Sequence, residues 1–193
     1  MEQTSLTLLD RLRGQSREED WTRLVLLYQP FIERFIRFDI RLADDAEDIG
    51  QEVLKKVVEH LPRFRRVRDG SFRAWLKTIT VNEVNHFWRK RLRHRAVGHD
   101  KGGLMLEALA DPAADLSQQW DREHDNYVLH RLLDLIEPEF SPTTWNAFRL
   151  RVFEEMPTAK AAVELQISKN AVDIAKSRVL ARLREEAAGL IEE

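Results

Sequence analysis

Apolar residues recur every three or four positions along nearly the whole chain, and no stretch sustains the alternation typical of a half-buried strand. Ser16 and Glu19 form a capping-box pattern before the first such segment, and Pro30 is expected to kink or interrupt it. Pro62 ends another segment, and Ser141 precedes a later one. The pattern predicts an all-α fold with helices over 16–37, 44–61, 71–95 and 120–136, and three more after residue 141.

The stretch between the two helical halves has a different composition. Residues 96–122 contain three glycines, one proline and little sustained periodicity, which is typical of a flexible linker. The chain is therefore expected to form two small helical domains, residues 1–95 and 123–193, joined by this linker.

Composition narrows the function classes. The 193 residues include no cysteine, which excludes disulfides and thiolate metal sites. No signal peptide is recognisable, and no apolar run approaches the roughly 18 residues of a membrane span. Six scattered histidines lack metal-ligand spacing, and no glycine-rich phosphate loop is present. We expect a cytoplasmic protein without a membrane segment, and neither catalytic residues, a metal nor a cofactor.

Charge is sorted along the chain, although Lys and Arg (31) nearly balance Asp and Glu (33). Residues 63–95 contain eleven basic and two acidic residues, whereas residues 39–59 contain seven acidic and three basic residues. Residues 100–125 contain seven acidic and two basic residues. Such segregation favours a polyanion at one patch and a basic partner at another.

The second predicted helix has an acidic face. Four carboxylates fall within an arc of about 60°, with apolar residues on the other side. The carboxylates are Asp45, Asp48, Glu52 and Glu59. The face is either solvated surface or a docking face for a basic partner.

The next helix has a polar face on which hydroxyl, amide and guanidinium groups share a narrow arc. These residues are Thr78, Asn82, Asn85 and Arg89. Such groups bind base edges and phosphates, although they also suit ordinary exposed positions. Phe64 and Phe72 lie among arginines, a mixture that suits unstacked bases, although Phe72 is expected in the core with Trp75, Leu76 and Ile79. Trp88 lies off the apolar face and is the aromatic of greater interest for such contacts.

Residues 158–177, "TAKAAVELQISKNAVDIAKS", fit a helix-turn-helix pattern. Ser168 is expected to cap the second helix, and Gln166 lies in the turn where glycine is usual. Small or apolar residues occupy the positions where the helices touch, namely Ala161, Ala162, Leu165, Ile167, Val172 and Ala175. A plain helical hairpin is the alternative interpretation.

The motifs "DAEDIGQEVLKKV", "GSFRAWLKTITVNEVNHFWRKR" and "SKNAVDIAKSRVLARLREE", in this order, make the chain resemble an extracytoplasmic-function sigma factor of the sigma-70 family. The resemblance covers roughly residues 20–95 and 125–187. It implies that the first domain is region 2 and the second is region 4. It also implies binding to the β′ clamp helices and β flap of core RNA polymerase and to promoter DNA, and it makes an anti-sigma factor a candidate partner.

The resemblance also implies roles for particular residues. Core polymerase would contact Asp45, Glu47, Asp48, Gln51 and Glu52. The −10 element would contact Arg63, Phe64, Arg65, Thr78, Asn82, Asn85, His86, Arg89 and Lys90. The −35 element would contact Ser168, Lys169, Asn170, Asp173, Lys176, Ser177 and Arg178. This chain departs from the family where His86 replaces a common aspartate, Asp173 a usual basic residue and Ala175 a frequent arginine.

Two other functions are alternatives to that of a sigma factor. A stand-alone helix-turn-helix regulator would bind an operator tightly without polymerase. This alternative assigns no function to the acidic face or to the arginine-rich loop, so it ranks second to a sigma factor. An enzyme has little support because no catalytic constellation is recognisable.

Overall fold

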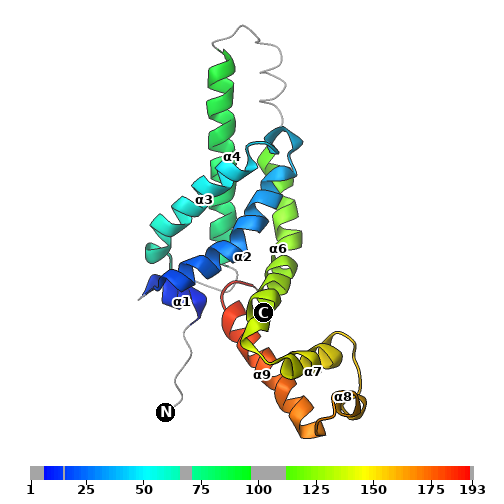
Figure 1. Ribbon diagram of the computed structural model, residues 1–193. Helices are drawn as coiled ribbons and strands as arrows, with labels where there is room; N and C mark the ends of the chain where they lie inside the picture. Colours follow the sequence, from blue (N-terminus) through cyan, green and yellow to red (C-terminus); the bar gives the residue numbers. More distant parts are fainter. Residues whose placement is uncertain (1–6, 15, 66–70, 97–111, 192–193) are drawn as a thin grey trace. The chain divides into compact units, whose positions relative to one another are not determined.

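The computed structural model describes residues 7–14, 16–65, 71–96 and 112–191 (Figure 1). Every regular element in these ranges is helical, which confirms the all-α prediction. The chain divides into two compact units, Leu8–Val128 with Gly189–Glu193, and Leu129–Ala188 with Met1–Thr7. We call them the larger and the smaller unit.

The larger unit contains α1 (Leu8–Arg13), α2 (Glu18–Arg37), α3 (Ala46–His60) and α4 (Ser71–Ala96). Helix α3 packs against both α2 and α4. Its apolar side is buried in these contacts, and the residues concerned are Ala46, Ile49, Val53, Leu54 and Val57. The opposite side of α3 is left for solvent or for a partner.

The start of α2 and the effect of its internal proline differ from the sequence prediction. The N-cap is Arg17 rather than Ser16, and Asp20 rather than Glu19 accepts its backbone N–H, at 3.1 Å. The helix also runs through Pro30 to Arg37 instead of ending there. Buried residues on both sides of the proline, such as Leu27 and Phe31, anchor the helix, so packing offsets the roughly 3 kcal/mol that an internal proline costs.

Helix α6 (Pro112–Ile136) begins earlier than expected, inside the stretch predicted as a linker. Proline is well suited to the first helical position because its missing N–H needs no partner there. The boundary between the compact units falls within this helix, after Val128.

The smaller unit contains the end of α6 with α7 (Pro142–Val152), α8 (Thr158–Glu164) and α9 (Lys169–Ala187). Helices α8 and α9 are joined by a short turn and pack around a core of small side chains, at the positions expected of a helix-turn-helix. The core consists of Ala147, Leu150, Ala161, Ala162, Val172 and Ala175, with Leu165 and Ile167 partly buried against it. Ser168 Oγ accepts the Ala171 N–H at 3.1 Å, which confirms the predicted cap.

Candidate functional site

The acidic face of α3 is exposed as the sequence predicted. Asp48, Glu52 and Glu59 are exposed, as are Glu47 and Gln51. Glu52 lies 3.6 Å from Lys55, one turn along the same helix. An ion pair between two exposed side chains contributes little, so these carboxylates remain available to an external cation.

Asp45 differs from the other carboxylates because it is tied to α4. Arg91 Nη1 donates to Asp45 Oδ2 at 3.1 Å and also to the Arg41 carbonyl at 3.1 Å. Both charged side chains of the Asp45–Arg91 pair are about one-third exposed, at 35% and 34%. Asp45 therefore links two helices of the larger unit, whereas Asp48 and Glu52 project from it.

Trp88 belongs to this linkage and is only 6% exposed. The Arg41 guanidinium carbon lies 4.6 Å from the Trp88 ring centroid, and that of Arg91 lies at 5.6 Å. The suggestion that Trp88 contacts bases is therefore wrong. Its ring is covered by two arginines that the chain itself supplies, an arrangement that sequence periodicity does not reveal.

Next to them, Arg41 also holds Asp39. The two side chains are joined by hydrogen bonds of 2.8 and 2.7 Å. Burial raises the pKa of the Asp39 carboxyl, but the hydrogen bonds from Arg41 outweigh it and leave the pKa below its usual value. Asp39 is therefore an anion that holds the Arg41 guanidinium against the face of the Trp88 ring.

The polar face of α4 is present over its described length. Thr78, Asn82, His86, Arg89 and Lys90 are exposed, and Asn85 is half-buried. Thr78 Oγ1 donates to the Ala74 carbonyl at 2.8 Å, so the hydroxyl oxygen can still accept a hydrogen bond. Arg89 Nε donates to the Asn85 carbonyl at 3.2 Å, which directs its guanidinium along the helix surface. The face thus presents amide, imidazole and cationic groups together.

The loop before α4 is described only through residue 65. Arg63 and Arg65 are exposed, but Phe64 is 8% exposed and packs on Phe72 and Trp75, with ring centroids 5.7 and 5.0 Å away. Phe64 therefore holds a core position in place of the exposed one that base stacking needs. The rest of the arginine-rich loop, 66–70, lies outside the described residues.

An ion pair between α3 and α4 that includes a buried carboxylate was not expected from the sequence. Glu83 is 7% exposed and its Oε1 accepts a hydrogen bond from Lys56 Nζ. A buried carboxylate needs such a partner, because an unpaired buried charge is costly. The pair fixes the two helices that carry the acidic face and the polar face.

Residues 119–128 of α6 also belong to the larger unit, which the sequence did not indicate. Trp120 and His124 are fully buried, and Trp120 lies 4.7 Å from Phe31 and 4.8 Å from Phe35, measured between ring centroids. We call residues 119–128 the α6 clasp. In the sequence, the one indication of these contacts was the excess of acidic residues over 100–125.

Three ion pairs surround the α6 clasp. Glu123 pairs with Arg34 at 3.0 Å, Asp125 with Arg73 at 2.9 Å and Asp121 with Lys77 at 2.7 Å. Arg73 and Lys77 lie on α4, in the basic segment identified from the sequence. The clasp therefore pairs with Arg73 and Lys77 in the middle of that segment, whereas Arg63, Arg65, Arg89 and Lys90 are exposed.

His124 lies at the centre of the clasp. Its Nδ1 is 2.7 Å from Asp125 Oδ1, and its Nε2 is 3.4 Å from the Tyr28 hydroxyl. Burial lowers the pKa of His124, and this effect outweighs the opposite effect of Asp125. Burial also raises the pKa of Tyr28 well above its usual value. The imidazole and the phenol are therefore both neutral near pH 7.

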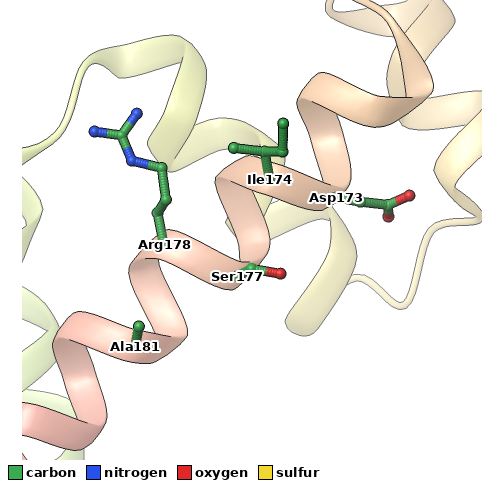
Figure 2. Close-up of a pocket in the computed structure, with 5 residues that line it drawn as sticks. All are labelled: Asp173, Ile174, Ser177, Arg178 and Ala181. Atoms are coloured by element: carbon green, nitrogen blue, oxygen red, sulfur yellow. The ribbon is translucent and has the colours of Figure 1, made fainter. Parts of the chain in front are cut away.

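In the smaller unit, α9 presents an exposed polar face with one apolar residue. Lys169, Asn170, Asp173, Ser177 and Arg178 are exposed, Lys176 is half-buried, and Ser168 is the N-cap. Ile174 is 48% exposed. A shallow groove of about 380 Å³ is lined by Asp173, Ile174, Ser177, Arg178 and Ala181. Figure 2 shows these side chains projecting from successive turns of α9.

Asp173 is oriented from α8. Thr158 Oγ1, at the first residue of α8, donates to Asp173 Oδ1 at 3.2 Å. The turn between the helices places Gln166 at φ 55°, the left-handed conformation that glycine adopts most easily. These contacts fix how the exposed face of α9 is presented.

Comparison with protein-family models finds a match to Sigma-70 region 2 over residues 24–94. This part of the chain is similar to a sigma-70 region 2 domain. It contains most of α2 together with α3 and α4, and so both the acidic face and the polar face. Sigma-70 proteins are RNA polymerase sigma factors, which bind core polymerase and are not enzymes. A search of curated proteins finds no significant match.

The residues matched to region 2 form most of the larger unit. The α6 clasp, which packs on its helices α2 and α4, lies beyond the matched residues. No helix in the described ranges of the chain combines the length and hydrophobicity needed to cross a lipid bilayer.

Proposed function

We propose that this protein is a sigma factor of the extracytoplasmic-function class, with a region 2 domain for core polymerase and the −10 element and a region 4-like helix-turn-helix for the −35 element. The observation that carries the proposal is the match of residues 24–94, because it includes both exposed faces found independently from charge and spacing. The helix-turn-helix of the smaller unit supports the second half.

Core binding is assigned to the acidic face of α3. Its exposed Glu47, Asp48, Gln51 and Glu52 suit a basic, polar surface such as the β′ clamp helices. Asp45 contributes by anchoring α3 to Arg91. The region 4-like unit would contact the β flap. An anti-sigma factor remains an expectation from the resemblance alone.

Promoter melting is assigned to the polar face of α4. Asn82, Asn85 and His86 can hydrogen-bond to exposed base edges, while Arg89 and Lys90 supply salt-dependent attraction to phosphates. Arg63 and Arg65 flank the start of the loop and would serve the same strand. Thr78 can accept one further hydrogen bond. The region binds bases once the strands part, which costs a few kcal/mol per unstacked base.

The −35 element is assigned to the exposed face of α9, in the manner of a recognition helix in the major groove. Lys169, Lys176 and Arg178 would contact phosphates, and Asn170, Asp173 and Ser177 would face base edges. Ser168 would act as the helix cap beside the backbone. Two weak contacts held on one chain reinforce each other through effective concentration, so neither domain needs to bind tightly alone.

Run-off transcription with purified core polymerase and a genomic promoter library tests the proposal. We expect the full chain to co-purify with core polymerase and to direct initiation at a subset of promoters. The free chain should bind duplex promoter DNA weakly. Tight, specific duplex binding without polymerase would instead identify a stand-alone helix-turn-helix regulator and overturn the proposal.

A further inference from the structure

We propose that Asp173 and Ile174 select a cytosine and a thymine on neighbouring base pairs of the −35 element, an inference that rests on the proposed function of α9. Both residues are exposed in the second turn of α9, and the N-terminal residues of a recognition helix are those that contact base edges. Their side chains line the groove in Figure 2.

Asp173 is suited to discrimination rather than to affinity. A carboxylate is repelled by phosphates, so its presence on a DNA-binding face lowers binding unless a base donates a hydrogen bond to it. Thr158 holds Oδ1 at 3.2 Å, which orients the carboxylate and leaves Oδ2 able to accept from a base. Lys169 and Arg178, on the same helix, supply the attraction to phosphates.

The base that satisfies Asp173 follows from the major-groove edges. Guanine presents two acceptors and thymine presents O4, and all of these repel a carboxylate. Adenine has the N6 donor, but its N7 acceptor lies beside it. Cytosine presents the N4 donor with no acceptor on its own major-groove edge, because the neighbouring ring position carries C5–H, so Asp173 favours cytosine.

Ile174 supplies the second preference. It is 48% exposed although it is a large aliphatic residue, and it adjoins Asp173 along the helix. The thymine C5-methyl is the apolar group that the major groove offers, and contact with it removes both from water. Because the two side chains come from consecutive residues, the two bases are expected on neighbouring pairs.

The first test selects promoters from a library with a randomised −35 region, using polymerase reconstituted with the full chain. We expect cytosine beside thymine to be enriched. Asp173→Asn should move the preference at the cytosine position to adenine by about tenfold, because an amide both donates to N7 and accepts from N6. Asp134→Asn makes the same chemical change at an exposed site of α6 and should leave the preference unchanged.

The second test replaces the selected thymine with deoxyuridine, which removes only the methyl group. Initiation by the wild-type protein should fall about threefold to fourfold, as expected for one buried carbon. The Ile174→Ala protein should be insensitive to the replacement. Equal losses for both proteins would overturn the isoleucine contact.

The outcomes separate the inference from the function on which it rests. A clear −35 preference that lacks cytosine, or that keeps it in Asp173→Asn, overturns the base assignment and leaves the sigma-factor proposal standing. A chain that does not associate with core polymerase, or polymerase that shows no −35 preference, overturns the proposed function and the base assignment with it.

Discussion

Gln166 is a residue at which local backbone preference and the fold disagree. Its φ of 55° lies in the left-handed region, where a side chain crowds the following carbonyl. The packing of α8 against α9 requires this turn, because Ala161 and Ala162 of α8 meet Val172 and Ala175 of α9 in one core. The smaller unit therefore carries a strain that glycine would relieve.

We expect Gln166→Gly to raise the free energy of unfolding of the smaller unit by about 0.5 kcal/mol, because relief of strain exceeds the entropy that glycine adds to the unfolded chain. Urea unfolding followed by circular dichroism measures it. Ala159→Gly, at an exposed site inside α8, is the control and should lower the free energy of unfolding by about 1 kcal/mol. A decrease for both variants would contradict the argument.

His124 makes the stability of the larger unit depend on pH. Its pKa is lowered from 6.5 by burial, so below pH 6.5 the unfolded chain binds more protons than the folded one, and stability falls as pH falls. We expect the melting temperature to be lower at pH 5.5 than at pH 7.5. Asp20 and Asp39, whose pKa values are lowered from 3.8, lose their contribution only in more acidic solution.

The variant His124→Gln should remove most of this pH dependence, whereas His86→Gln, at an exposed position, should keep it. Thermal unfolding at the two pH values measures both. An unchanged drop in melting temperature for His124→Gln would show that another group is responsible.

At the scale of elements, the α6 clasp extends the core of the larger unit beyond the residues matched to region 2. Trp120 is fully buried against Phe31 and Phe35, so its indole completes a core to which α2 contributes the other rings. The ion pairs around it join partly exposed side chains and contribute less, about 0–1 kcal/mol each. Apolar burial, rather than charge, holds the clasp.

We therefore expect Trp120→Ala to lower the free energy of unfolding of the larger unit by about 3–5 kcal/mol. Asp121→Asn, which breaks only the pair with Lys77, should lower it by less than about 1 kcal/mol. Denaturant unfolding of the full chain compares the two. Equal effects would mean that the clasp is held by charge.

These elements also show what sequence can and cannot predict. The faces of α3 and α4 and the caps at Ser141 and Ser168 depend on residues within a few positions of one another, so periodicity and spacing predicted them. The burial of Trp88 and Trp120 depends on partners far along the chain, such as Arg41 and Phe31. No local pattern carries that information, and both were missed.

At the scale of the molecule, the region 2-like part of the chain separates its charges onto two helices that the Lys56–Glu83 pair joins. The acidic face of α3 suits a basic protein surface, and the polar face of α4 suits nucleic acid. If this division holds, polymerase binding and strand opening are separable by mutation. A stand-alone regulator has no reason to show such a separation.

Asp48→Arg tests the first face. The new cation would face a basic partner, so we expect the affinity for core polymerase to fall by about tenfold. Polymerase that has already bound the variant should open promoters normally. Asp134→Arg, an equal change of charge at an exposed site in the smaller unit, is the control for non-specific repulsion. Pull-down with purified core polymerase measures the affinities.

Asn82→Ala tests the second face, and the two variants together decide whether the faces act separately. Asn82 is exposed on α4 and its amide can bind a base only after the strands part, so its loss should lower open complexes by about tenfold and leave core binding intact. Permanganate footprinting of unpaired thymines measures opening directly. Because Asp48 and Asn82 lie on different helices, a common defect would have to pass through the contacts between α3 and α4, which include the Lys56–Glu83 and Asp45–Arg91 pairs. If Asn82→Ala and Asp48→Arg impaired the same step, the assignment of one task to each face would be wrong.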